Sequence, residues 1–192
     1  MRDILKFIKE DYRIFRLVHR GNVFLNLIYL PSFKIVLLFR LSQLFDTYKL
    51  FKPFAYFCTL LNDFLHGVWI GPGVQVGKGF YLGHPRGLVV NPNTIIGDYC
   101  SIIQQVTLGG PCLKIGNNVS INAGAKIISD PIKKKLVEIG DNCIIAAGAI
   151  VLVSMKENSI VAGMPAKCVK EITENDNWLN KRESINLENG KN

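Results

Sequence analysis

The sequence lacks a long apolar run, a paired cysteine motif and a recognisable signal peptide. Between residues 23 and 66, a Pro, Lys, Arg or Asp interrupts every apolar run before about 18 residues accumulate, so no transmembrane span is predicted. The five cysteines are widely spaced without a C-x-x-C pair, which argues against a disulfide framework or a zinc site. The N-terminus shows no small-residue cleavage site. These absences favour a reducing, cytoplasmic compartment.

The sequence also lacks the patterns of nucleic-acid, phosphate-loop and metal sites. The net charge is +8, but residues 1–66 hold ten Lys or Arg against five Asp or Glu, and the rest hold thirteen against ten. Because this charge forms no stripe with interleaved aromatic residues, we expect no sequence-specific nucleic-acid binding. The glycines form no phosphate-binding motif, and His and carboxylate residues do not cluster at ligand spacing. We therefore expect no metal ion.

A repeat of six residues dominates the sequence from 70 to 151. A six-residue period fits neither the helix period nor strand alternation, and is typical of a solenoid whose stacked faces share one interior. Small or aliphatic residues, among them Cys100 and Cys143, tend to follow four positions later and are expected in the core. The repeating aliphatic positions are Ile70, Val76, Leu82, Val90, Ile96, Ile102, Leu108, Ile115, Ile121, Ile127, Ile139, Ile145 and Val151.

Two segments without the repeat flank it. Residues 1 to about 20 have the spacing of an amphipathic helix, and residues 23–66 are rich in Phe, Leu and Tyr. We predict a helical N-terminal region at 1–66, a β-solenoid at 67–170, and a short helix with a loose tail at 171–192. The N-terminal region is expected to cap the solenoid or to pack between subunits. Peripheral contact with the inner face of a membrane, with Lys and Arg facing the headgroups, is the alternative.

Three segments break the period, and such departures are where loops project from a solenoid. The first is HPRG at 84–87, within an interval of eight residues, and the second is GGPC at 109–112. The third is PIKKKL at 131–136, where Lys133 would occupy a core position. We therefore predict that 131–136 forms an excursion whose lysines are solvated.

His84 is the strongest candidate for a catalytic group among the three histidines. His19 and His66 are expected to be structural, whereas His84 lies in a period-breaking loop between Gly83 and Gly87. A loop on a rigid repeat can hold a general base against a substrate, and a neutral imidazole can take a proton from a hydroxyl or amine. An ordinary exposed loop histidine is the alternative.

Together with the hexads, four further segments resemble the hexapeptide-repeat acyltransferases, most closely their serine acetyltransferase-like branch. These segments are QQVTLGG at 104–110, INAGAK at 121–126, AAGA at 146–149 and AGMPAK at 162–167. The resemblance covers residues 68 to about 170, and the N-terminal region matches only in being helical. It implies a left-handed parallel β-helix, a homotrimer, and acetyl-CoA as co-substrate in the groove between neighbouring subunits.

The resemblance also assigns roles to individual residues. His84 matches the catalytic histidine that deprotonates the acceptor hydroxyl. Small residues at Gly110, Ala123 and Ala147 would let the pantetheine arm approach the backbone, and amides near Gly109 and Gly110 would stabilise an oxyanion. Two basic residues near the CoA end of the groove could meet its phosphates. These two are Lys126 and Lys167.

The sequence departs from the serine acetyltransferase pattern beside His84. Gly83 and Trp69 stand where that pattern has acidic residues, and its second histidine is absent. The loop at 84–87 looks more like that of relatives that acetylate sugars, with Arg86 and Trp69 expected beside the acceptor. We therefore expect an acetyl-CoA-dependent O-acetyltransferase acting on a sugar or a precursor of capsule, O-antigen or exopolysaccharide.

Alternatives stay open for the acceptor, for the activity itself and for the route of acetyl transfer. The acceptor could be serine or another small molecule, or the chain could be an inactive acetyl-CoA-binding scaffold. Direct attack in a ternary complex is favoured over an acetyl-enzyme. Cys112 follows the Gly109-Gly110 pair and is retained as a candidate nucleophile, although no base is evident beside it.

Overall fold

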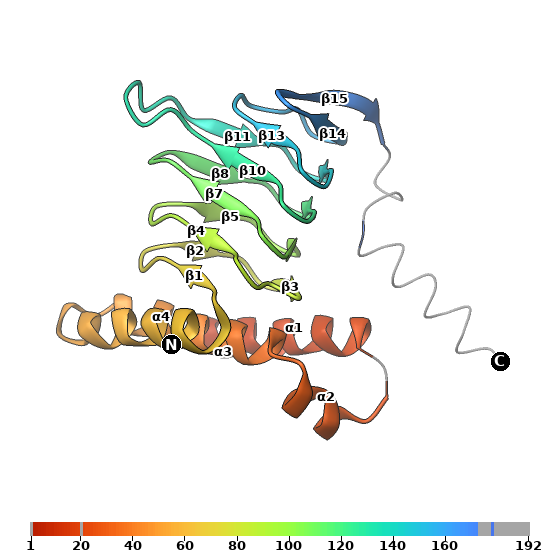
Figure 1. The fold of residues 1–192 in the computed structure, drawn as a ribbon. Coiled ribbons are helices and arrows are strands. Elements are labelled where there is room, and N and C mark those ends of the chain that lie inside the picture. Colours follow the sequence, from red (N-terminus) through yellow and green to blue (C-terminus); the bar gives the residue numbers. More distant parts are fainter. Residues whose placement is uncertain (1, 20, 173–177, 179–192) are drawn as a thin grey trace.

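The structure is a computed structural model, and it describes residues 2–19, 21–172 and 178. The helix and tail predicted at 171–192 therefore lie outside the described residues, apart from Glu171, Ile172 and Trp178. Helices occupy the N-terminal third of the chain (Figure 1). They are α1 (Arg2–Val18), α2 (Val23–Tyr29), α3 (Ser32–Asp46), a 3₁₀ turn (Lys49–Phe51) and α4 (Lys52–His66).

Short strands follow from Trp69 to Glu171. They are β1 (Trp69–Ile70), β2 (Gln75–Val76), β3 (Tyr81–Gly83), β4 (Val89–Val90), β5 (Ile95–Ile96), β6 (Ser101–Ile103), β7 (Thr107–Gly109), β8 (Leu113–Ile115), β9 (Ser120–Ile121), β10 (Lys126–Ile128), β11 (Val137–Ile139), β12 (Ile144–Ile145), β13 (Ile150–Val151), β14 (Ser159–Gly163) and β15 (Ala166–Glu171).

The strands form the three faces of a left-handed β-helix of about five coils (Figure 1). Sheet A has the order β1-β4-β7-β10-β13, sheet B the order β11-β8-β5-β2, and sheet C the order β15-β14-β12-β9-β6-β3. Neighbouring strands are parallel except for β14 and β15. The predicted solenoid fold is confirmed.

The interior of the β-helix is built from the hexad positions. Each of the repeating aliphatic residues named above is at most 4% exposed, and Ile70, Val90 and Leu108 stack in register through sheet A. The positions four residues later, such as Cys100 and Cys143, are also fully buried. Burial raises the pKa of the Cys100 thiol to about 12. The interior prediction is therefore confirmed.

Two of the three corners carry the candidate site residues. The histidine corner comprises the turns from sheet C to sheet A, at 84–88, 104–106, 122–125 and 146–149. The lysine corner comprises the turns from sheet A to sheet B, at 71–74, 91–94, 110–112 and 129–136. The first period break lies at the histidine corner, and the other two lie at the lysine corner.

The helices cover the first coil of the β-helix, which confirms the predicted cap (Figure 1). A fully buried ion pair inside the cap supports this junction: Arg40 of α3 donates from Nε to Asp11 of α1 at 2.8 Å. Arg40 also donates to the carbonyl oxygens of Val76 and Gly77, while Asp11 accepts from the amide of Phe80. These contacts fasten the cap to the third corner, at 77–80.

One face of the cap carries exposed apolar side chains. They repeat at helical spacing along the 3₁₀ turn and α4, which places them on one side of this segment. No helix in the described part of the chain is long and apolar enough to cross a bilayer. Membrane contact through this face stays a prediction. The exposed residues are Leu50, Phe54, Phe57, Leu60 and Phe64.

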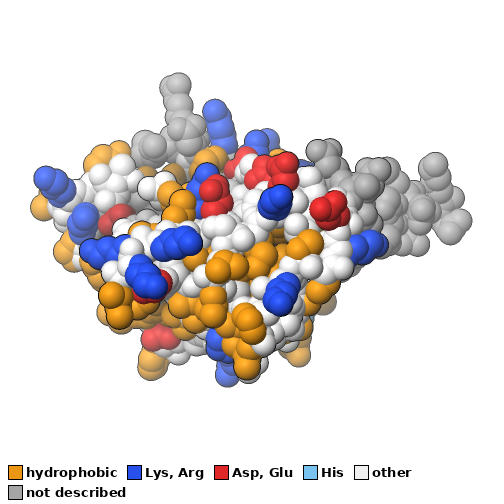
Figure 2. Space-filling view, turned by 90° about the horizontal axis from the view of Figure 1, so that it is seen from above, with side chains coloured by type: hydrophobic (Ala, Val, Ile, Leu, Met, Phe, Trp, Pro, Cys, Tyr) orange, Lys and Arg blue, Asp and Glu red, His pale blue; other side chains and the backbone are white. Residues whose placement is uncertain are grey.

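An antiparallel hairpin closes the other end of the solenoid, and the hexad analysis did not predict it. Strand β15 folds back on β14, with Ala162 opposite Lys167. Seen from this end, Lys and Arg side chains lie at several places among hydrophobic and acidic ones (Figure 2). Trp178 contacts the opposite end of sheet C, where its ring stacks on Tyr81 and its Nε1 donates to the Tyr99 carbonyl at 2.9 Å.

Candidate active site

His84 lies on a turn that is held from below and from above. The amide of Gly87 donates to the carbonyl of Gly67 at the end of α4, at 2.8 Å, and the amide of Gln105 donates to the carbonyl of Arg86, at 3.0 Å. The positive φ of His84 is shared by corner residues such as Gln105, so it reflects the turn geometry of the solenoid. The imidazole itself is exposed. A rigid scaffold therefore presents an accessible base.

The histidine corner continues from His84 along the whole solenoid. Successive turns are joined by backbone hydrogen bonds, so their residues form one column. Ala147 in this column is exposed and Ala123 is half-buried. A Cβ atom added to Gly148 would meet no atom within 4 Å. The joining bonds run from Gln105 to Arg86, from Gly124 to Gln104 and from Gly148 to Ala123.

The two predicted phosphate-binding lysines lie next to this column. Lys126 is the first residue of β10 and is exposed, so it follows directly after the corner turn. Lys167 is exposed on β15, next to the turn that ends the column. The structure thus brings His84, Ala123, Ala147 and both lysines to one edge of the β-helix.

The predicted oxyanion donors do not join them. Gly109 ends β7 and Gly110 begins the next turn, so both belong to the lysine corner, at the other edge of sheet A. At about 3.3 Å per residue, the three residues of β7 separate the two corners by roughly 10 Å. Within one chain, Gly109 and Gly110 do not lie beside His84, because the hexad period places these two breaks at different corners. Their part as oxyanion donors stays a prediction that needs a neighbouring subunit.

Cys112 shares the lysine corner and is half-buried, with its amide donating to Ser129 Oγ at 3.1 Å. The excursion at 131–136 also lies there, and Asp130 Oδ1 accepts from the amides of Ile132 and Lys133. The lysines of the excursion are exposed, as predicted. This corner is therefore removed from His84, and Cys112 gains no base from it.

The two positions that depart from the acidic pattern have different surroundings. Gly83 is buried, and a Cβ atom there would lie 2.8 Å from Ile103 Cγ2. A carboxylate could therefore not replace Gly83 without movement of sheet C. Trp69 is half-buried at the start of β1, in register with Val89 of β4. Neither position supplies an acidic partner to His84.

A cavity of about 210 Å³ lies beside His84, between the cap and the solenoid. His66, the last residue of α4, enters it, although the sequence analysis treated His66 as structural. Burial and the nearby charges of Lys34 and Arg86 lower the pKa of His66. The sequence held one signal that could have indicated this place for His66. Gly67 directly follows it and ends helix α4, which leaves His66 at the helix end that faces the solenoid. The cavity is lined by Pro31, Ile35, His66, His84, Pro85 and Arg86.

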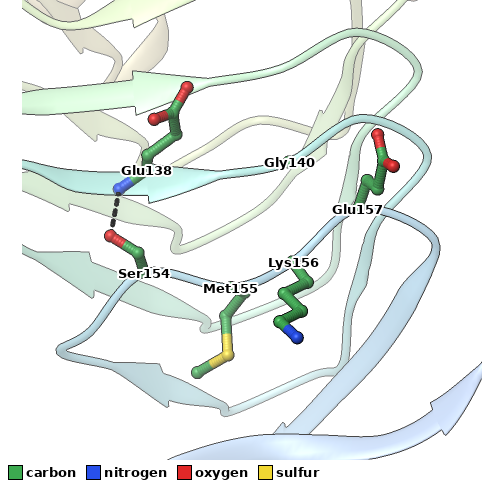
Figure 3. Close-up of a pocket in the computed structure, with 6 residues that line it drawn as sticks. All are labelled: Glu138, Gly140, Ser154, Met155, Lys156 and Glu157. Atoms are coloured by element: carbon green, nitrogen blue, oxygen red, sulfur yellow. Dashed lines mark hydrogen bonds between the residues drawn. The ribbon is translucent and has the colours of Figure 1, made fainter.

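A larger hollow of about 420 Å³ lies elsewhere, against sheet B near the closing end (Figure 3). It is lined by Glu138, Gly140, Ser154, Met155, Lys156 and Glu157, and Ser154 Oγ accepts from the Glu138 amide. These six residues include no histidine, and the hollow lies away from the histidine corner. We therefore place the candidate active site at the cavity beside His84.

Comparisons with known proteins agree with this geometry. Serine acetyltransferase from Synechococcus elongatus is 37% identical over 116 residues, which are 57% of this chain and 45% of that protein. The structure of serine O-acetyltransferase from Brucella melitensis matches with a TM-score of 0.80 at 30% identity, over 90% of this chain and 69% of that one. This chain belongs to the serine acetyltransferase family of hexapeptide-repeat acyltransferases.

The family relationship extends beyond the solenoid. Serine acetyltransferase from Brucella abortus in complex with coenzyme A matches with a TM-score of 0.79 at 29% identity, over 90% of this chain and 70% of that one. Since residues 67–170 are too few to make up that share, the likeness includes part of the helical cap. The chain spans about half the length of the curated relatives it matches. No protein-family model matches the sequence.

The predicted sugar or polysaccharide acceptor is wrong. The relatives that match at 32–37% identity are named serine acetyltransferase, as are the matching structures, which favours the small-molecule alternative. The prediction rested on the loop at 84–87 and on the lost acidic residues. These features alter the surroundings of the base, but the same base serves any hydroxyl, so they could not identify the acceptor.

Proposed function

We propose that this chain transfers an acetyl group from acetyl-CoA to the hydroxyl of serine, with His84 as general base. The position of His84, on a braced turn that opens into a small cavity, carries the proposal. Family membership supports the choice of donor and acceptor, and the Brucella abortus relative was solved with coenzyme A.

The reaction needs one base and no covalent intermediate on the protein. His84 takes the proton of the serine hydroxyl while the oxygen attacks the thioester carbon. The carbon–sulfur bond then breaks, and the sulfur of the departing CoA receives the proton from His84. The products are O-acetylserine and CoA, and His84 returns to its neutral form. Because no base is evident beside Cys112 in the described residues, direct attack accounts for the chemistry better than an acetyl-enzyme.

Acetyl-CoA is proposed to lie along the histidine corner. The exposed methyl side chain of Ala147 and the half-buried one of Ala123 leave the column open to a pantetheine arm, whose amides can pair with backbone groups. Lys126 and Lys167 would meet the phosphates near the far end of this path. The thioester would then lie nearest to His84.

A homotrimer is part of the proposal. Gly109 and Gly110 lie at the lysine corner of the same chain, so they can act near His84 only if a neighbouring copy brings them there. In a trimer, the histidine corner of one subunit would face the next subunit across the acetyl-CoA groove. The oligomeric state in solution, measured by light scattering, tests this part.

The direct test measures CoA release from acetyl-CoA with L-serine. We expect release by the unaltered protein and a loss of about 10²–10⁴-fold in kcat for His84→Ala. His19→Asn is the matched control, because His19 contacts Tyr81 and lies outside the cavity. Normal turnover by His84→Ala would overturn the role of His84. Acetyl-CoA binding without turnover by the unaltered protein would instead favour the inactive scaffold.

A further inference from the structure

The cavity beside His84 contains two polar side chains that the proposed proton transfer does not use. His66 enters it from the end of α4, and Arg86 enters it from the turn that carries His84. In the part of the chain that the structure describes, neither side chain makes a hydrogen bond or an ion pair. Two uncommitted polar groups beside a catalytic base suggest a ligand that would pair with them.

The backbone holds these two side chains next to each other. Gly67 ends α4 in the left-handed conformation, with φ of 63°, and its carbonyl accepts the hydrogen bond from Gly87. A Cβ atom on Gly67 would lie 3.7 Å from Arg86 Cγ, so the stem of Arg86 passes directly over this glycine. The helix end and the catalytic turn therefore bring His66 and Arg86 to the same cavity.

The charge in and around the cavity is positive. Its six lining residues include Arg86 but no Asp or Glu. Burial and the nearby charges of Lys34 and Arg86 lower the pKa of His66, which favours its neutral imidazole form. The Lys34 ammonium donates to the carbonyl of Ile28 at 2.9 Å. This surrounding favours an anionic group on the ligand and offers nothing to balance an ammonium group.

We propose that this cavity binds the acceptor through its carboxylate, that Arg86 and His66 determine this specificity, and that the acceptor class is the small hydroxy acids, with the ammonium group of serine dispensable. The inference rests on the proposed function, since it takes His84 as the base that receives the acceptor's hydroxyl proton. Arg86 was expected beside the acceptor from sequence, whereas its charge preference and the part of His66 come from the structure.

The chemistry of the groups supports this assignment. A guanidinium binds a carboxylate through two parallel hydrogen bonds, which fixes the orientation of the acceptor as well as its position. A neutral imidazole can donate one further hydrogen bond from its protonated nitrogen. A volume of about 210 Å³ is also smaller than the roughly 300–1,000 Å³ of drug-sized sites, so a small acid fits it better than an oligosaccharide would.

The test uses the whole chain and compares three acceptors in the CoA-release assay. L-Serine carries both charged groups, L-serinamide lacks the carboxylate, and 3-hydroxypropanoate lacks the ammonium group. We expect kcat/KM to fall about 10- to 100-fold for serinamide, as for the loss of a charge-assisted hydrogen-bond pair, and to change by less than about threefold for 3-hydroxypropanoate.

Variants assign the effect to the cavity. Arg86→Gln should raise the KM for serine about tenfold or more and remove most of the difference between serine and serinamide. Arg86→Lys should restore part of that difference, because it keeps the charge but not the fork of donors. His66→Ala should raise the KM for serine by a smaller factor. Lys170→Gln, at the other end of sheet C, is the matched control and should leave all three acceptors unchanged.

The outcomes separate this inference from the proposed function. If no acceptor releases CoA, the proposed function fails and the inference fails with it. If serine is acetylated in a His84-dependent reaction but serinamide reacts equally well, only the inference is overturned. A strong preference for serine over 3-hydroxypropanoate would overturn the claim about the ammonium group. Retained discrimination in Arg86→Gln would overturn the role of Arg86.

Discussion

The two corners that flank sheet A differ in the space between successive coils. At the lysine corner, a Cβ atom on Gly110 would overlap the carbonyl oxygen and the hydroxyl of Ser129 in the next coil. At the histidine corner, a Cβ atom on Gly148 would meet nothing within 4 Å, and one on Gly124 would only touch the Gly148 nitrogen, at 4.0 Å. Similar repeats thus build a tightly packed turn at Gly110 of the lysine corner and turns at Gly124 and Gly148 of the histidine corner that have room for a ligand.

The third corner, at 77–80, differs from both because it joins the solenoid to the helical cap. There, side chains of the cap satisfy backbone groups that the first coil would otherwise leave without partners. A solenoid needs such a cover at its ends, since an uncovered first coil would expose the interior. The three corners therefore differ in their surroundings: one is attached to the cap, one packs tightly at Gly110, and one is the proposed path of acetyl-CoA.

The largest effect should come from breaking the contacts between the cap and the third corner, at 77–80. Arg40→Met leaves the carboxylate of Asp11 buried and unpaired, and should lower the free energy of unfolding by about 3–5 kcal/mol. Urea denaturation followed by circular dichroism measures this loss. The double variant Arg40→Met with Asp11→Leu is the control, because removal of both charges should cost less than removal of one. Equal losses in the two proteins would show that the ion pair does not anchor the cap.

The tightly packed turn at Gly110 should be the next most sensitive. Gly110→Ala forces a methyl group against Ser129 at a φ of 90°, and should lower the free energy of unfolding by about 2–4 kcal/mol. Gly148→Ala is the matched control, because its φ of 69° imposes a conformational cost of about 1–2 kcal/mol without a clash. Equal destabilisation of the two variants, measured by urea denaturation, would contradict the difference between the corners.

Much of the fold could be predicted from the hexads alone. A residue such as Ile102 or Ile127 returns at a fixed spacing because each coil buries one side chain per face, so local sequence determines the interior directly. The excursion at 131–136 could be predicted for the same reason, since Lys133 has no place in such an interior. The closing hairpin of β14 and β15 could not, because its pairing is antiparallel and carries no hexad period.

The active site could be predicted only in part. The break at 84–87 identified His84. The sequence did not show which break lies at which corner, so it could not reveal that Gly109 and Gly110 lie at the other edge of sheet A. The position of His66 beside His84 was missed because it depends on how α4 docks. That docking is set by contacts distant in sequence, such as Asn62 Nδ2 donating to the Ile35 carbonyl at 3.1 Å. The family motifs indicated the donor, whereas the proposed acceptor site combines groups from two separate regions of the sequence.

A smaller effect should come from placing a larger side chain on the histidine corner. Ala147→Leu places a branched side chain on the proposed path of the pantetheine arm, so the KM for acetyl-CoA should rise about tenfold, equivalent to about 1.4 kcal/mol of binding. Because Ala147 is exposed, the free energy of unfolding should stay within about 0.5 kcal/mol of its original value. An unchanged KM for acetyl-CoA would mean that the cofactor does not follow the histidine corner.

The smallest effect should come from the three exposed lysines at the lysine corner. Replacing Lys133, Lys134 and Lys135 by Gln together should change the KM for acetyl-CoA by less than about twofold, because these side chains are exposed on an excursion at the other edge of sheet A. Lys126→Gln is the comparison, since Lys126 adjoins the histidine corner and should raise that KM severalfold. A larger effect from the triple variant than from Lys126→Gln would contradict the assignment of phosphate binding to Lys126. It would show that the lysine corner of a neighbouring subunit reaches the phosphates, so that both corners, from different chains, bind the same cofactor.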